Sequence, residues 1–479
     1  MSRQGLIVDL PNELLLNIFR YYIDACPRFW PRLVHTCGKW RRIVFTSQQA
    51  LHLQLFCTHG TPALKTLDCW PTLPIVVQYG GTPSLDPPAP DDEDNIVATL
   101  KQSDRVRSIS LTVTSSLLEK LSAIERPFLE LETLVLLSRE GTWLTLPPTF
   151  RWGVQLRTLH LTWPDIPALP KLLSLSTALV DLQLSKISNV EYFSLNALAN
   201  ALAGMTQLRT LLLHFLSVTL HRNDLTLPSQ SQECIALPAL TRLQYRGTSE
   251  YLDSFVTKID APRLRKIDIT FFCRPTMDAS QVGQFLNRIK MQQSCQVEII
   301  SSERAIFISF TPSGAPSSLE LHVSCSPLNQ RLLYMAQICN SLTTFLQGVE
   351  YLRISARKPS SSSWWDYRDL NEWGMLIHPF RGTKWAHISG NHSTNIVLAL
   401  CLQQCEAVLP ALHKLCIQES EQRHAPLREA VVSFIHSRRL SGHIIGFEYE
   451  RVRITELLGA GTAFVQLQFA LQTNFLGSE

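Results

Sequence analysis

The stretch LRTLHL at residues 156–161 decides the fold, because its pattern L-x-x-L-x-L recurs along the chain. Recurrences or close variants start at residues 106, 131, 179, 208, 240 and 264, as VRSISL, LETLVL, LVDLQL, LRTLLL, LTRLQY and LRKIDI. The seven starts are separated by 25, 25, 23, 29, 32 and 24 residues. Short runs of alternating apolar residues at such intervals are typical of strands in a repetitive array.

Helix-like stretches lie between these strands, for example YFSLNALANALAGM at 192–205 and QVGQFLNRI at 281–289. Strand, helix and strand at this spacing predict parallel strands joined by right-handed crossovers. The spacing and the strand signature resemble leucine-rich repeats, which stack into a curved solenoid. The consensus asparagine is absent after the strands that end at Leu161 and Leu184, so we expect an irregular array of uneven curvature.

Side chains alternate along a strand, so the array has a buried face and an open, concave face. The buried set is Leu134, Leu136, Leu159, Leu161, Leu182, Leu184, Leu211 and Leu213. The candidate target-binding set on the concave face is His160, Gln183, His214, Gln244, Arg246, Asp268 and Arg353. These seven are polar and of mixed charge, which favours a protein segment as ligand. The alternative is that these seven residues are ordinary solvated strand positions with no binding role.

The pattern changes over residues 295–323, where strand-like runs are joined by short turn-like segments. This predicts antiparallel hairpins. The strand–helix rhythm then resumes with strands starting at 349, 384, 411 and 443. The helices expected in this part of the chain are 329–346, 368–378, 393–405 and 426–440.

The N-terminal segment reads IVDLPNELLLNIFRYYI over residues 7–23. Pro11 suits the first turn of a helix, and Asp9 stands where it can help to cap that turn. One wide apolar stripe is expected to follow, formed by Leu14, Leu15, Ile18, Phe19 and Tyr22. A second helical stretch, FWPRLVHTCGKWRRIVF, occupies 29–45. About forty residues cannot bury all of this apolar surface alone.

The run Leu10-Pro11-x-Glu13-Leu14-Leu15-x-x-Ile18-Phe19, followed by Cys37-x-x-Trp40-Arg41, resembles the F-box. The resemblance implies a three-helix platform that inserts into the Skp-type adaptor of SCF (Skp–cullin–F-box) ubiquitin ligases. The residues that the resemblance places at or just beneath that interface are Leu10, Pro11, Leu14, Ile18, Phe19 and Trp40. The alternative is a helical hairpin that packs on the main body of the chain.

The resemblance extends to the expanded F-box proteins of mushroom-forming fungi (basidiomycetes), which pair an F-box with a leucine-rich-repeat-like C-terminal region. It is carried by the segments at 51–77, 364–373, 409–415 and 431–443. We therefore expect an α/β fold in three parts: an F-box module (1–50), a connecting region with a Pro/Asp-rich loop (51–105), and an irregular solenoid with a mainly parallel sheet (106–479). The resemblance supplies no target.

Composition excludes several classes of protein. Of 479 residues, 45% are hydrophobic and 18% charged, so disorder over the whole chain is not expected. The formal net charge of +4 is too mild to predict a nucleic-acid partner. No apolar run approaches ~18 residues, so no membrane partner is expected. The twelve dispersed cysteines and the lack of a secretory h-region predict an intracellular protein with reduced thiols, in cytoplasm or nucleus.

Two segments read as exposed loops, 80–95 and 357–369. The acidic run Asp91–Asp94 is expected to be solvated, and Trp364 and Trp365 are expected to tuck back onto the body of the protein.

No nucleotide-binding, serine-hydrolase or zinc-protease motif occurs, so neither enzymatic activity nor a cofactor is expected. The group nearest to a metal site is Cys401, Cys405, His413 and Cys416, which we interpret as buried cysteines and a surface histidine. The function predicted is a non-catalytic substrate-recognition adaptor of an SCF-type ubiquitin ligase. The alternative is an interaction scaffold whose N-terminal module packs internally.

Overall fold

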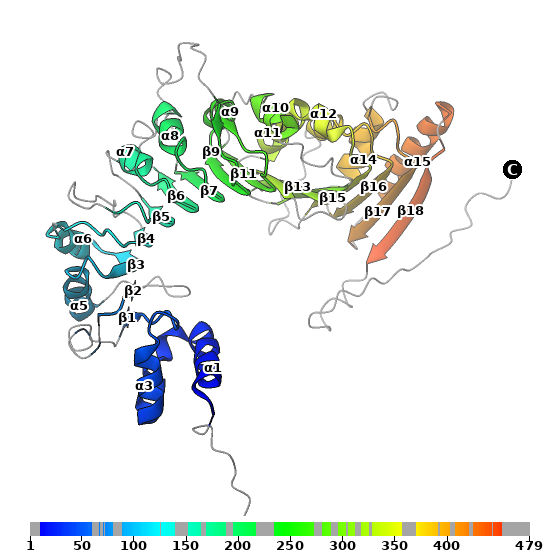
Figure 1. Ribbon diagram of the computed structural model, residues 1–479. Coiled ribbons are helices and arrows are strands. Elements are labelled where there is room, and N and C mark those ends of the chain that lie inside the picture. The colour runs from blue at the N-terminus through cyan, green and yellow to red at the C-terminus, as the bar shows by residue number, and fades with distance from the viewer. Residues whose placement is uncertain are drawn as a thin grey trace, which may run out of the picture. The chain divides into compact units, whose positions relative to one another are not determined.

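Figure 1 shows the structure, a computed structural model. The chain divides into two compact units. Unit 1 is formed by Met1–Phe193 and Asn200–Leu208, and unit 2 by Ser194–Ala199 and Arg209–Glu479. The described residues are 10–59, 67, 70, 72–79, 89–124, 126–138, 152–163, 169–187, 195–216, 234–272, 280–288, 296–302, 305–311, 318–324, 328–356, 370–390, 393–402, 408–420, 425–442 and 444–452.

Unit 1 begins with a module of three short α-helices and one 3-10 turn: α1 (Asn12–Ala25), η2 (Pro27–Phe29), α2 (Pro31–Thr36) and α3 (Gly38–Thr46). Prolines start the second and third of these elements, where the missing N–H has no intrahelical partner to lose. The module has its own buried apolar core, formed by Leu15, Phe19, Ile23, Trp30, Leu33, Val34, Ile43 and Val44.

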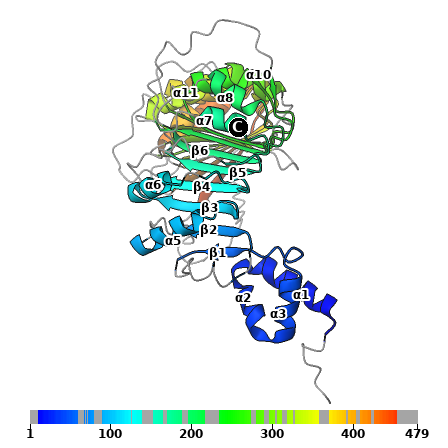
Figure 2. The same cartoon turned by 60° about the vertical axis from the view of Figure 1, so that its left-hand side comes forward.

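The strands of unit 1 follow one another in chain order and pair in parallel (Figure 2). They are β1 (Leu55–Cys57), β2 (Ile75–Tyr79), β3 (Val106–Val113), β4 (Thr133–Ser138), β5 (Thr158–Thr162) and β6 (Asp181–Ile187). The helices between them are α5 (Pro90–Leu100), α6 (Ser115–Ser122) and α7 (Leu169–Ser174). The sheet therefore already contains two strands within 51–105, before the repeat expected to start at residue 106.

Unit 2 contains strands in the order β7-β9-β11-β14-β13-β12-β15-β16-β17-β18. Their bounds are β7 (Thr210–Phe215), β9 (Arg242–Gly247), β11 (Lys266–Phe272), β12 (Gln296–Ser301), β13 (Ala305–Thr311), β14 (Ser318–Ser324), β15 (Tyr351–Ala356), β16 (Trp385–Gly390), β17 (Lys414–Ser420) and β18 (Gly446–Val452). A small parallel pair, β8 (Ile235–Ala236) and β10 (Ile259–Asp260), stands apart from this order.

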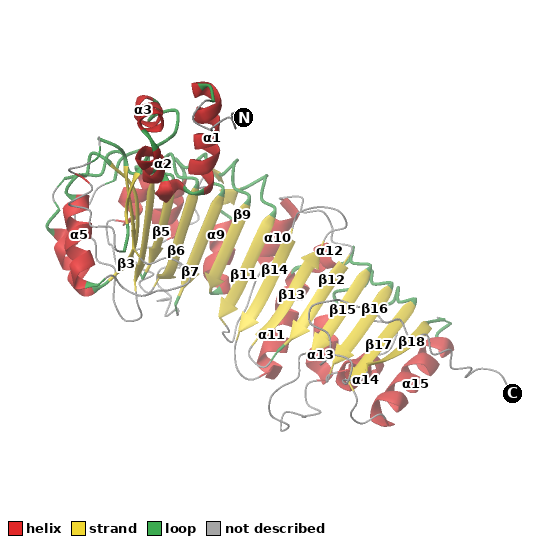
Figure 3. Cartoon of the chain, turned by 90° about the horizontal axis from the view of Figure 1, so that it is seen from below, coloured by secondary structure: helices red, strands yellow, loops and turns green. Residues whose placement is uncertain are grey.

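Helices cover one face of the unit 2 strands, and Figure 3 shows the strands with these helices behind them. They are α9 (Ser249–Val256), α10 (Ser280–Arg288), α11 (Leu328–Ser341), α12 (Thr343–Leu346), α13 (Leu370–Ile377), α14 (Ser393–Leu402) and α15 (Ala425–Leu440). The division between the units passes through α8 (Leu195–Leu202). The predicted helices are thus present, and the C-terminal ones begin within two residues of the expected positions.

The segment predicted to form antiparallel hairpins does so: β13 pairs antiparallel with both β12 and β14. The sequence did not reveal their order in the sheet. The last strand, β14, pairs in parallel with β11, and the first strand, β12, pairs in parallel with β15. Two reversals of direction return the chain to its starting direction, so this three-strand meander joins a parallel array without breaking it.

The alternation expected along the strands is confirmed. The eight leucines predicted to be buried are all at most 1% exposed. Because the strands are in register, these side chains form continuous rows: Leu134, Leu159 and Leu182 are successive partners in β4, β5 and β6. The opposite side chains face away from the helices. We call this side the open face of each unit.

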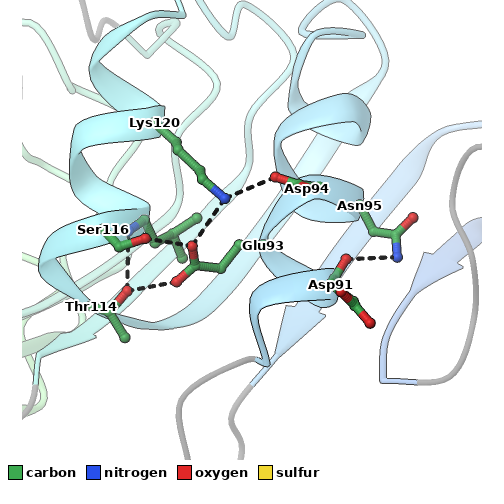
Figure 4. Close-up of polar contacts among 8 residues, drawn as sticks. Asp91, Glu93, Asp94, Asn95, Thr114, Ser116 and Lys120 are labelled. Atoms are coloured by element: carbon green, nitrogen blue, oxygen red, sulfur yellow. Dashed lines mark hydrogen bonds and ion pairs between the residues drawn. The ribbon is translucent and has the colours of Figure 1, made fainter.

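The segment 80–95 is not a loop throughout, because α5 begins at Pro90, and Glu93 in its first turn is buried. The carboxylate of Glu93 accepts hydrogen bonds from Thr114 Oγ1 at 2.9 Å and from Ser116 Oγ at 2.6 Å (Figure 4). Lys120 Nζ lies 3.2 Å from Glu93 and 2.8 Å from Asp94. Glu93 therefore joins α5 to the start of α6, whereas Asp94 remains exposed, as expected.

Replacing Glu93 with alanine is expected to destabilise unit 1 by about 1–3 kcal/mol, because the hydroxyls of Thr114 and Ser116 lose their acceptor and Lys120 keeps only Asp94. Burial alone would raise the pKa of Glu93, but the bonds from Ser116 and Thr114 and the contact with Lys120 hold it below its ordinary value. A depressed carboxyl pKa stabilises the fold above the pKa of the unfolded chain, and this contribution is lost as the pH falls. Denaturant unfolding at several pH values measures both effects.

Asp94→Ala is the matched control, since the Asp94 side chain is 80% exposed. Its effect on stability should stay within about 0.5 kcal/mol. Equal effects of the two substitutions would contradict the role assigned to Glu93.

Candidate functional site

Helix α1 is apolar on two sides. Leu15, Phe19 and Ile23 point into the core of the module. On the outward side, Leu14 is 50% exposed, Ile18 46% and Tyr21 79%. The outward residues are spaced by four and three positions and share one helix face. We call Leu14, Ile18 and Tyr21 the α1 patch. An exposed group of large apolar side chains on a helix is typical of a protein-binding surface.

The six adaptor-binding residues predicted from the sequence lie in three environments. Pro11, Leu14 and Ile18 are exposed, and Leu10 and Trp40 are half-buried. Phe19 is fully buried, so it cannot touch a partner in this arrangement. Its ring meets that of Trp40 edge-on, with 4.8 Å between ring centroids. Phe19 therefore supports the exposed residues from beneath.

Helix α1 is tied to α3 at its start, because Lys39 Nζ donates a hydrogen bond to the carbonyl oxygen of Leu10 at 2.8 Å. Tyr21 was not predicted as a site residue. Its position three residues after Ile18 is the signal that could have found it. The single wide stripe expected on α1 is in fact two stripes, and one of them faces outward.

A different side of the module packs against the rest of unit 1. Trp30 Nε1 donates to the carbonyl oxygen of Gln54 at 2.7 Å, and the Trp30 ring meets Trp70 edge-on at 4.9 Å. Arg28 also donates to the side-chain oxygen of Gln78. These contacts come from η2 and the turn into α2. Among the described residues, no hydrogen bond or ring contact joins the α1 patch to the rest of unit 1.

On the open face of unit 1, His160 of β5 and Gln183 of β6 are cross-strand neighbours. Both are half-buried and both contact Asp181, with His160 Nε2 at 3.1 Å and Gln183 Nε2 at 3.2 Å from a carboxylate oxygen. Asp181 therefore lies against two of the seven predicted target-binding side chains and accepts a hydrogen bond from one of them, Gln183.

The other five predicted residues lie on the open face of unit 2. His214 is the cross-strand neighbour of Arg246, and Gln244 that of Asp268. Burial, followed by the charge of Arg246, lowers the pKa of His214 to about 4. His214 is therefore neutral near pH 7 and can both donate and accept a hydrogen bond.

Arg353 of β15 lies between two side chains that the sequence analysis missed. Its Nε is 3.6 Å from Glu298 Oε1 on β12, and its other cross-strand neighbour is His387 on β16. Burial, followed by the charge of Arg353, lowers the pKa of His387. Both residues could have been found from the alternation of side chains between the two faces of a strand, Glu298 along β12 and His387 along β16.

The remaining candidates carry no site chemistry among the described residues. Cys401 and Cys416 are half-buried, and His413 is exposed. Cys405, Trp364 and Trp365 lie outside the described part of the chain.

No family model matches the chain, and no curated protein matches it. Among solved structures, a leucine-rich repeat-containing protein, LegL7 from Legionella pneumophila, matches at 10% sequence identity with a TM-score of 0.25. The match covers 80% of this chain and 97% of that chain. None of the described helices has the length and apolar character needed to cross a membrane.

Proposed function

We propose that the chain is a substrate-recognition adaptor of an SCF-type ubiquitin ligase. In this proposal the N-terminal module is an F-box that binds a Skp-type adaptor, and the strand array binds a target protein. The chain itself has no catalytic role, and neither nucleic acid nor membrane is a partner. The assignment to the basidiomycete F-box family belongs to the same proposal and rests on the sequence motifs quoted above.

The observation that carries the proposal is the α1 patch. Its three residues expose a large apolar surface from a helix whose opposite side already supplies the core of the module. Burying such surface gains about 25 cal/mol per Å². A helix with an unpaired apolar face, mounted on a self-contained core, is well suited to insert into a groove of a partner.

Charge supports the same partner class. Arg28, Arg32, Arg41 and Arg42 of the module are exposed. Long-range attraction between such basic residues and an acidic adaptor would mainly raise the association rate. Binding at one part of the chain and target capture at another would make ubiquitin transfer effectively intramolecular.

An interaction scaffold without a ligase partner is the second candidate. The contacts of Trp30 with Gln54 and Trp70 favour it, since they show that part of the module packs internally. The two candidates differ in what they require of the α1 patch: only the adaptor proposal requires it to bind a Skp-type protein.

The target-binding half of the proposal is tested on the open face of unit 2. Changing Gln244, Arg246 and Arg353 together to alanine should remove most captured proteins other than ligase subunits. The side chains are not among the buried core, so the fold should persist. Affinity capture from an extract, quantified by mass spectrometry, compares this variant with wild type.

The matched control leaves the open face unchanged. It replaces three exposed residues of α15 with alanine: Arg428, Glu429 and Arg439. Capture should then equal that of wild type. If the open-face variant stays folded and retains every non-ligase partner, the strand face is not the target surface.

A further inference from the structure

Three side chains on the open face of unit 2 converge without bonding to one another. Asp268 on β11, and Glu320 and His322 on β14, bring one ligand atom each to within 4.8 Å of the other two. The Nε2 atom of His322 lies 3.7 Å from Asp268 Oδ1 and 3.8 Å from Glu320 Oε2. Charge-assisted hydrogen bonds between such groups are ~2.7–2.9 Å long, so these are not direct bonds.

The register of the sheet creates this group. Asp268 and Glu320 are direct cross-strand partners, and His322 follows Glu320 by two residues on the same face. Two carboxylates placed opposite each other on neighbouring strands repel and destabilise the pair. The arrangement is therefore stabilised by a positive charge between them.

The protein's own groups supply only part of that charge. Among the described residues, His322 is the one basic side chain within 4 Å of both carboxylates. Neither Arg242 nor Lys266 forms an ion pair with Asp268 or Glu320 in the described part of the chain.

The spacing fits a bound cation. Atoms separated by 3.7, 3.8 and at most 4.8 Å share a point about 2.4 Å or less from each of them. Zinc binds imidazole nitrogen and carboxylate oxygen at ~2.0–2.2 Å, which a small rotamer adjustment reaches. The His322 ring is held in place by an edge-on contact with Phe307, at 4.5 Å between ring centroids.

We propose that Asp268, Glu320 and His322 bind one divalent transition-metal cation, with zinc as the ion best suited to this ligand set. The cation would join β11 to β14, where the parallel array meets the antiparallel meander. Three protein ligands leave a coordination position directed to the open face, where water or a carboxylate of a bound protein can complete the shell.

The experiment uses the full chain, reduced and stripped of metal with a chelator. Titration with Co²⁺ should show one site per chain, with visible d–d absorption and no near-ultraviolet thiolate-to-metal band. That spectrum separates this site from the cysteines. Zn²⁺ should displace the Co²⁺ stoichiometrically.

Glu320→Gln and His322→Asn should each weaken the site about tenfold or more, since each removes one ligand while keeping the side-chain size. Glu298→Gln is the matched control: it removes a half-buried carboxylate from the same face, paired with Arg353, and should leave affinity unchanged. Circular dichroism checks that the variants fold. Three results would overturn the proposal: no stoichiometric site, a thiolate band, or equal affinity in wild type and in both ligand variants.

Discussion

Replacing Leu14 and Ile18 together with alanine is expected to weaken binding to a Skp-type adaptor by about 100-fold or more. Truncating large apolar residues at the centre of an interface costs about 2 kcal/mol or more each, and about 1.4 kcal/mol corresponds to a factor of ten. Both side chains are about half exposed, so the module should remain folded. Titration calorimetry with the purified adaptor measures the change.

Helix α15 offers a control in which exposed apolar residues are also replaced with alanine, but away from α1. Val432 and Leu440 are also exposed apolar residues of a helix, and changing both to alanine should leave adaptor affinity unchanged. If the Leu14/Ile18 variant binds as tightly as wild type while remaining folded, the α1 patch is not the docking surface.

Leu182→Ala is expected to reduce the stability of unit 1 by about 2–5 kcal/mol. Leu182 is 0% exposed and lies in the row that also contains Leu159, so its truncation leaves a cavity that the neighbouring strands can fill only partly. Denaturant unfolding followed by circular dichroism provides the measurement.

Gln183→Ala tests the same strand one residue further on. Gln183 is half-buried on the open face, and its contact is with Asp181. Its replacement should change stability by about 1 kcal/mol or less. Similar losses from both substitutions would mean that β6 does not alternate between a buried and an open face as described.

The strands could be predicted because their signal is local. Each L-x-x-L-x-L segment carries its own alternation, so the burial of Leu159 and Leu182 followed from the sequence. The first two strands were missed because LFC at 55–57 and IVVQY at 75–79 lack that spacing. Helix α5 was missed because Pro90 and the aspartates after it are also typical of loops.

Features that depend on neighbours distant in sequence could not be predicted. The antiparallel pairing of β12, β13 and β14 followed from their short connections, but their reversed order in the sheet did not. The meeting of Asp268 with Glu320 depends on that order, because it places β14 next to β11. On α1, adjacent apolar residues merged into one predicted stripe, and only the packing against α3 shows which of them face outward.

The most direct test of the central claim is whether the purified full chain forms a complex with a purified Skp-type adaptor. Size-exclusion chromatography with light scattering should show a 1:1 complex, and hydrogen–deuterium exchange should show new protection in α1 and none on the open face of unit 2. Two separate peaks at micromolar concentrations of both proteins, with no change in exchange at α1, would contradict the adaptor function.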